Sequence, residues 1–219
     1  MIKKTTQFAG RHYETGSVQN ALALQDVRAP HTGKPFSEAF LLGVSGGITF
    51  GYFTFEYKGH LPHVAILTRN TFDPFQTTLE RLGVEQQVYQ TTKANIAEKN
   101  LVEALATGNP AIVWADEYSL PYTHKNPAAY WNMIPIVVYG IEDDVALIAD
   151  RSAKPFRAKL EVLTKARARV KDDKFRLITI ASPQTSKLVS ATQKGIWQCA
   201  SLFTDKPPKG ARHNFGFAA

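Results

Sequence analysis

The sequence predicts an α+β fold in which helices come first and a mainly antiparallel sheet follows. The second half of the chain contains several short apolar runs, a composition typical of strands buried in a sheet. An acidic turn at residues 141–144 joins two of these runs as a hairpin would. With 219 residues, 44% of them hydrophobic, the chain is long and apolar enough to bury a substantial core.

In the first half, a helix is expected to begin near Glu14 or Thr15, since either side chain can cap it. Asp73 and Pro74 are expected to start a later helix, which Gly83 closes. The other elements predicted here are a short helix at 37–43, strands at 48–57, 63–69 and 84–91, and an amphipathic helix at 95–108.

The second half is predicted to contain more strands and to end in a helical segment. Its elements are strands at 110–116, 134–140 and 144–150, a basic helix at 160–170, a strand at 175–180 and a helix at 185–203. We therefore expect an α+β domain over 1–182 and a helical segment over 183–219 that could start a second domain. The sequence leaves open whether the chain is the first part of a longer protein.

Composition excludes several kinds of site. The single cysteine, Cys199, excludes an internal disulfide and a Cys-rich metal site, and its apolar surroundings predict a buried, unreactive thiol. His60, His63 and His124 lack a convincing metal-ligand spacing, so neither a metal nor a cofactor is expected. No apolar run is long enough for a membrane span or a signal peptide, and we expect a cytoplasmic protein.

The net charge of +7 is concentrated in one segment. Residues 151–176 carry ten Lys or Arg against three acids. Helical spacing of the apolar residues predicts that Lys159, Lys165, Arg167 and Arg169 face solvent. This pattern is typical of a solvated helix face, and it also suits an anionic partner such as an acyl carrier protein or a phosphate-bearing ligand. Nucleic acid is not expected, because no aromatic-interleaved basic stretch or recognised binding motif accompanies the charge.

The stretch QFAGRHYETGSVQNALAL, residues 7–24, has the layout in which a papain-like enzyme presents its nucleophile. Such a site places a cysteine at a helix N-terminus, a histidine on a strand, an acid that orients the histidine and a glutamine that donates to the oxyanion. Gln7 stands six residues before Tyr13, where the cysteine would be. The strand–turn–strand stretch 134–150 ends at Asp150, where the orienting acid would be.

Five stretches carry a family resemblance: GRHYETGSVQNAL, SEAFLLGVSGGITFGYF, WADEYSLPY, IVVYGIEDD and ALIAD. With these features, the sequence resembles the butirosin biosynthesis protein H N-terminal family. The resemblance runs from about Gln7 to the end of the chain. It implies a papain-like fold, often followed by a helical domain, and transfer of an aminoacyl group from a carrier protein to an aminoglycoside amine. It places the family's cysteine at Tyr13 and its histidine at Ile134, whereas Gln7 and Asp150 match.

Without both the cysteine and the histidine, we expect a domain that has lost its chemistry and binds a small molecule or an acyl group, in secondary metabolism. The residues expected to line its binding site are Gln7, Tyr13, Ser45, Gly46, Asp116, Ile134 and Asp150.

Two alternatives stay open. An active acyltransferase or amidase could use a site rebuilt around His12, Tyr13, Glu14 and Asp150, with His12 as the general base. A scaffold that binds an acidic partner through the basic helix is the second alternative. Asp116 and Glu117 are adjacent at a strand end and are expected to point to opposite faces, which makes them a poor carboxylate pair.

Overall fold

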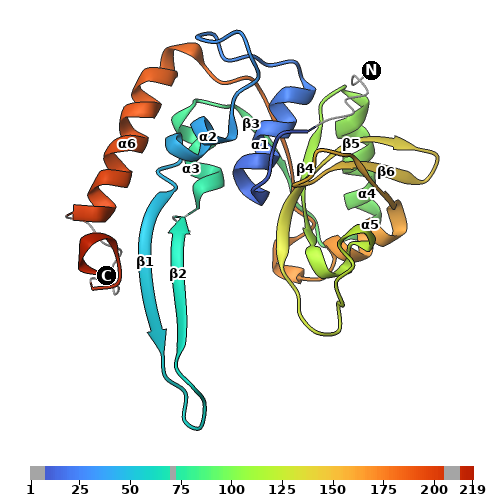
Figure 1. The fold of residues 1–219 in the computed structure, drawn as a ribbon. Coiled ribbons are helices and arrows are strands. Elements are labelled where there is room, and N and C mark those ends of the chain that lie inside the picture. Colours follow the sequence, from blue (N-terminus) through green and yellow to red (C-terminus); the bar gives the residue numbers. More distant parts are fainter. Residues whose placement is uncertain (1–7, 70–72, 205–212) are drawn as a thin grey trace. The chain divides into compact units, whose positions relative to one another are not determined.

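A computed structural model describes residues 8–69, 73–204 and 213–219 of the chain (Figure 1). The chain divides into two compact units. Unit 1 comprises residues 1–38 and 84–182, and unit 2 comprises residues 39–83 and 183–219. The predicted division into 1–182 and 183–219 differs from this arrangement, because the C-terminal segment packs with residues 39–83 instead of standing alone.

Unit 1 is built on a six-stranded sheet with the strand order β3-β8-β4-β5-β6-β7, in which each neighbouring pair is antiparallel. This arrangement confirms the predicted α+β class. Its helices and strands are α1 (Tyr13–Leu24), β3 (Gln86–Tyr89), α4 (Ala94–Ala106), β4 (Ala111–Asp116), β5 (Met133–Glu142), β6 (Val145–Ala149), β7 (Phe156–Lys159), α5 (Leu160–Arg167) and β8 (Leu177–Ile180).

One face of this sheet packs against α4 and α5. Alternate residues of β4, β5 and β6 form a hydrophobic cluster with side chains from both helices, among them Leu101 of α4 and Leu163 of α5. The members that β5 contributes are Ile134, Ile136 and Val138. Because side chains alternate along a strand, these three residues fix which face of β5 the two helices cover.

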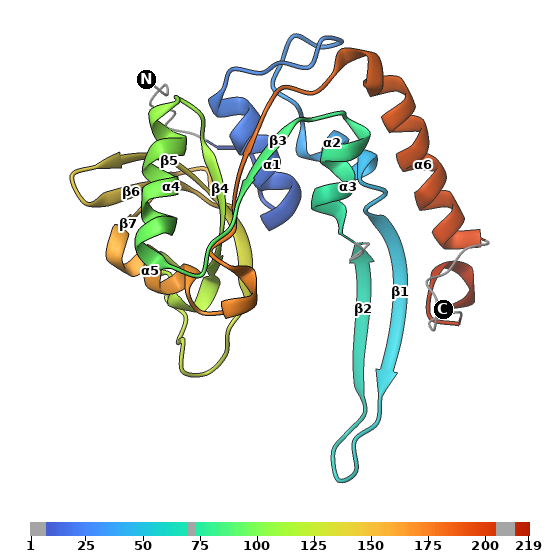
Figure 2. The same cartoon turned by 180° about the vertical axis from the view of Figure 1, so that it is seen from behind.

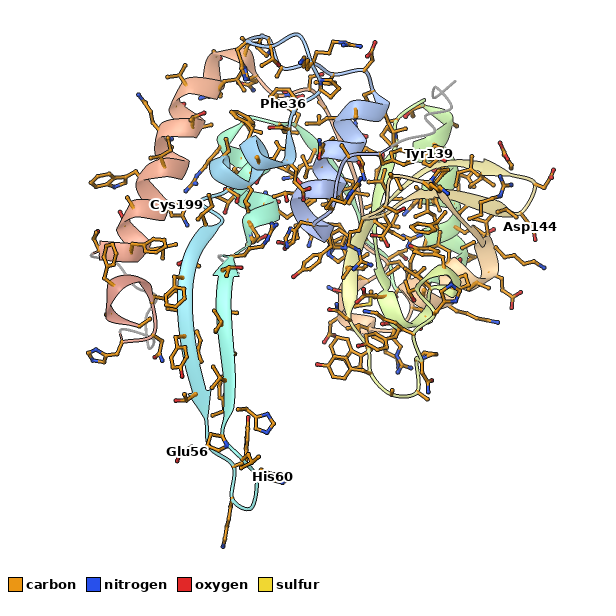
Figure 3. All side chains as sticks on the ribbon, viewed as in Figure 1. Phe36, Glu56, His60, Tyr139, Asp144 and Cys199 are labelled. Atoms are coloured by element: carbon orange, nitrogen blue, oxygen red, sulfur yellow. The ribbon has the colours of Figure 1, made fainter. Side chains whose placement is uncertain are left out.

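The other face of β5 packs against α1. Val137 and Tyr139 alternate with the cluster residues and are also buried. The ring of Phe8, which precedes α1, lies 5.5 Å from the ring of Tyr139, and α1 contacts β5 and β4. Figure 3 labels Tyr139 within this sheet and Asp144 at the β5–β6 turn. The sheet of unit 1 therefore has helices on both faces.

Unit 2 contains α2 (Glu38–Val44), which begins at the last residue of unit 1's first segment, and the antiparallel hairpin β1 (Ile48–Phe55) and β2 (His63–Arg69). It also contains α3 (Pro74–Arg81) and α6 (Leu188–Thr204), and Figure 2 shows these elements from behind. Asp73 caps α3, since its carboxylate accepts from the Gln76 backbone N–H. This confirms the predicted start of that helix.

Three predicted features differ from the structure. Helix α1 begins at Tyr13, with His12 as its N-cap, instead of near Glu14 or Thr15. Strand β7 was not predicted, because its sequence FRAK is short and half polar. Cys199 lies on α6 (Figure 3) but is half-buried, since this helix has few buried residues.

Within the described part of the chain, no helix combines the length and the apolar character needed to cross a bilayer. The same residues contain no group of three His, Cys, Asp or Glu side chains placed to hold a metal ion. His60 lies near the tip of the β1–β2 hairpin (Figure 3), and His63 starts β2.

Candidate functional site

The N-terminus of α1 carries Tyr13, the residue that the family resemblance places in the nucleophile's position. Tyr13 is the first residue of the helix, and its side chain is 38% exposed. Its ring lies 4.3 Å from the ring of His12. A phenol at the start of a helix is therefore accessible to solvent beside an imidazole. Unlike a cysteine thiol, a phenol has an ordinary pKa near 10 and needs a base to become a nucleophile.

A carboxylate already occupies the start of this helix. The side chain of Glu38 accepts hydrogen bonds from the backbone N–H groups of Arg11 at 2.8 Å and His12 at 2.7 Å. It also accepts from the Thr15 hydroxyl at 3.1 Å. In a papain-like enzyme, the positive end of the helix dipole stabilises a thiolate. Here a glutamate that no motif singled out supplies the negative charge at this end.

The position expected for the family's histidine lies elsewhere. Ile134 is 1% exposed and belongs to the hydrophobic cluster between the sheet and helices α4 and α5. Helix α1 covers the other face of β5, so the structure does not bring Ile134 to Tyr13 around one concavity. The expected cluster of these two residues is therefore wrong. The physical reason is strand alternation, which turns an isoleucine at this position into the core.

Asp150, at the end of β6, is held by two other side chains. Its Oδ1 accepts from Arg151 Nε at 2.7 Å, and its Oδ2 accepts from the Tyr122 hydroxyl at 3.1 Å and from Arg151 Nη2 at 3.2 Å. Burial and the Asp150 carboxylate raise the pKa of Tyr122 above its ordinary value. The acid that would orient a histidine is thus bound to a guanidinium and a neutral phenol.

Glu117 extends this network. Its carboxylate accepts from Arg151 Nη1 at 2.7 Å, from Lys125 Nζ at 2.9 Å and from the Asn132 amide at 3.1 Å. Burial alone would raise the pKa of Glu117, but the hydrogen bonds from Lys125, Arg151 and Asn132 outweigh it and lower the pKa to about 2. Glu117 is therefore ionised at neutral pH.

Asp116, the last residue of β4, joins the same network. Its Oδ1 accepts from the backbone N–H groups of Asn132 at 2.9 Å and Tyr118 at 3.2 Å. Its Oδ2 accepts from the Ser119 hydroxyl at 2.5 Å. Since Asn132 donates to both Asp116 and Glu117, the two adjacent acids meet at one residue. The prediction that the Asp116 and Glu117 side chains point to opposite faces did not anticipate this shared partner, because the strand ends at Asp116 and the chain turns at Glu117.

We call this set the acidic network. Its members, from three strand ends and the turns beside them, are Asp116, Glu117, Ser119, Tyr122, Lys125, Asn132, Asp150 and Arg151. Each of its three carboxylates accepts hydrogen bonds and also lies within ion-pair distance of a cation, Arg169 for Asp116, Lys125 and Arg151 for Glu117, and Arg151 for Asp150. Arg151 has a left-handed backbone with φ 40°, a conformation that costs a non-glycine residue free energy and is held here by two ion pairs. This arrangement suits positioning more than proton transfer.

The other predicted site residues are spread over the chain. Gln7 lies outside the described residues. Ser45 and Gly46 belong to unit 2, where the Ser45 hydroxyl donates to the Leu42 carbonyl at 2.6 Å and Gly46 turns the chain with φ 68°. Glu14 lies in the first turn of α1, and its carbonyl accepts from the Ser17 hydroxyl at 2.7 Å.

The predicted basic face is smaller than expected. Arg167 is 2% exposed and donates from Nη2 to the Phe175 carbonyl at 2.8 Å, so it does not face solvent. Lys165 pairs with Glu161, and Arg169 lies 3.8 Å from the Asp116 carboxylate. The helix ends at Arg167, and the chain that follows it covers this side chain, which a helical wheel cannot anticipate.

Comparison with protein families matches residues 12–151 to the family described as butirosin biosynthesis protein H, N-terminal. The match therefore covers more than half of the chain, including Tyr13, Ile134 and Asp150. A search among curated proteins found no match.

Proposed function

The chain belongs to the butirosin biosynthesis protein H N-terminal family, and we propose that it is a member without acyl-transfer chemistry that binds a small molecule or an acyl group. The observation that carries the proposal is the position of the missing histidine. Ile134 is buried in the core, and Asp150, the acid that would orient the histidine, is bound by Arg151 and Tyr122 instead. Neither position offers a proton acceptor to a nucleophile at Tyr13.

The start of α1 supports the same proposal. Glu38 places a negative charge beside the helix N-terminus. An anionic nucleophile or a developing oxyanion at this point would be repelled instead of stabilised. A neutral ligand group, by contrast, can donate to or accept from the accessible Tyr13 hydroxyl. The family name belongs to a biosynthesis protein, and a role in secondary metabolism follows as part of this proposal.

The proposal is tested with the whole chain and a small acyl thioester or amide, with the Tyr13→Phe variant as the matched control. We expect no turnover above the rate without protein, and a folded variant. Loss of one neutral hydrogen bond should weaken ligand binding by about 0.5–1.5 kcal/mol. Turnover by the wild type that falls about a hundredfold or more in Tyr13→Phe would make Tyr13 catalytic and overturn the proposal.

An active acyltransferase or amidase is the second candidate, and the proximity of the His12 and Tyr13 rings favours it. In that case His12 would have to act as the general base for the Tyr13 hydroxyl. A His12→Gln variant tests this candidate, because it keeps a polar side chain at the N-cap but cannot accept a proton. Equal, background-level rates for His12→Gln and wild type would exclude it.

An acidic partner such as an acyl carrier protein remains a third proposal. It now rests on the exposed residues Lys159, Lys165 and Arg169, since Arg167 is buried. Binding of an acyl carrier protein that weakens in a Lys159→Glu variant would support it. Binding that is unchanged by this charge reversal would remove it.

A further inference from the structure

A cavity of about 420 Å³ lies in unit 1, between the N-terminus of α4 and the turn after α5. It is lined by Thr92, Ala94, Arg167, Ala168, Val170, Lys171 and Phe175. None of these residues belongs to the acidic network. The cavity is large enough for a small group, and its lining combines two cationic side chains with the first residue of a helix.

Arg167 is the unusual member of this lining. It is 2% exposed, and its Nη2 donates to the Phe175 carbonyl, but its buried Nε–H has no hydrogen-bond partner among the described residues. No ion pair to Arg167 is present in the same part of the chain. A buried donor without a partner costs free energy, and a buried cation without a counter-ion costs more. Burial lowers the pKa of Arg167 to about 10, so the side chain is still charged at neutral pH.

The N-terminus of α4 adds a second source of positive potential. This helix has 13 residues, and its first residue, Ala94, lines the cavity. Its N-cap is Lys93, whose side chain makes no capping hydrogen bond, and its first turn carries no acid. The backbone N–H groups of such a turn and the helix dipole both favour an anion.

We propose that this cavity binds the phosphate group of a small-molecule ligand. Arg167 would supply an Nε–H donor and a buried charge, Lys171 a second charge at the opening, and α4 its N-terminal backbone groups. Two cations and a helix N-terminus match a phosphate better than a carboxylate, because a phosphate ester carries up to two charges and three acceptor oxygens. Asp172 and Asp173 follow Lys171 in the same turn, and neither lines the cavity.

The experiment is calorimetric titration of the whole chain with inorganic phosphate at constant ionic strength, with acetate as the second ligand. We expect saturable phosphate binding, and weaker binding of acetate. Arg167→Met should raise the phosphate Kd at least about tenfold, since it removes a charge-assisted hydrogen bond. Lys171→Gln should raise it about threefold, because this charge is exposed.

The matched control is Lys165→Gln, which removes one exposed positive charge from α5 at a residue outside the cavity. Its phosphate Kd should equal that of the wild type. Lys171→Gln also keeps the test decisive if Arg167→Met does not fold, since Lys171 is exposed and outside the core. Absence of saturable phosphate binding would overturn the proposal, as would acetate binding of equal strength. Equal weakening by Lys165→Gln and Lys171→Gln would do the same, because it would reveal an unspecific charge effect.

Discussion

Replacing Arg151 with methionine removes a guanidinium that joins two buried carboxylates. Its Nε and Nη2 donate to Asp150 at 2.7 and 3.2 Å, and its Nη1 donates to Glu117 at 2.7 Å. The side chains of Asp150 and Glu117 are only 3% and 8% exposed, so water cannot fully replace these bonds. Methionine keeps most of the side-chain volume and offers no donor.

The expected loss follows from these contacts. Breaking a buried ion pair by removing one partner costs about 3–5 kcal/mol. Arg151 is 28% exposed, and both carboxylates keep other donors, Tyr122 for Asp150 and Lys125 for Glu117. We therefore expect Arg151→Met to lower the free energy of unfolding by about 2–4 kcal/mol at neutral pH.

Urea unfolding, with the midpoint and slope measured for each variant, checks this value. The matched control is Arg157→Met, because Arg157 pairs with Glu142 at 3.0 Å but the two side chains are 56% and 37% exposed. An exposed pair of this kind should contribute at most about 1 kcal/mol. If Arg151→Met costs no more than Arg157→Met, the acidic network does not stabilise the fold as its geometry implies.

The remaining predictions concern pH, a hydrogen bond at the start of α1 and one close backbone contact. The pKa of Glu117 is depressed from 4.5 to about 2, so the stability that its ionised form contributes is present above pH 4.5 and is lost as the pH falls from 4.5 toward 2. Urea unfolding at several acid pH values should show the difference in unfolding free energy between wild type and Arg151→Met narrowing in that interval. A difference that stays constant would contradict a Glu117 that is ionised through its pairing with Arg151. Glu38→Gln should destabilise unit 1 by about 1–2 kcal/mol in urea unfolding, since a neutral amide oxygen accepts more weakly from the His12 N–H. Gly195→Ala should cost more than about 2 kcal/mol, because its Cβ would lie 2.1 Å from the Gly43 carbonyl oxygen, whereas Gly43→Ala meets nothing within 4 Å and should cost under about 1 kcal/mol by the same measurement.

Much of the fold could be predicted because its signals are local. Asp73, Pro74 and Gly83 mark the ends of α3 by capping, by a fixed backbone angle and by a left-handed turn, and these act within a few residues. Apolar runs likewise predicted β4, β5 and β6 and the hairpin between the last two. Strand β7 was missed, since its FRAK sequence gains its place from pairing with β6 and not from its own pattern.

The candidate site could be predicted only in part. From the sequence alone, the family resemblance implies that Tyr13 and Ile134 stand where the family's cysteine and histidine would be. It did not reveal Glu38 as the partner of the α1 N-terminus, because Glu38 lies 26 residues after His12 and no local motif links the two. It also did not reveal that Arg151, next to Asp150, reaches back to Glu117 across 34 positions.

The sequence by itself determined the kinds of element in this protein, because periodicity and capping are properties of neighbouring positions. Only the tertiary structure decided which side chains meet. It turned Ile134 into the core instead of toward α1, buried Arg167 beneath the turn that follows its helix, and gathered Asp116, Glu117 and Asp150 around shared donors. These outcomes depend on which face of a strand is covered and on how distant segments pack, and burial then sets the electrostatic cost of each charge.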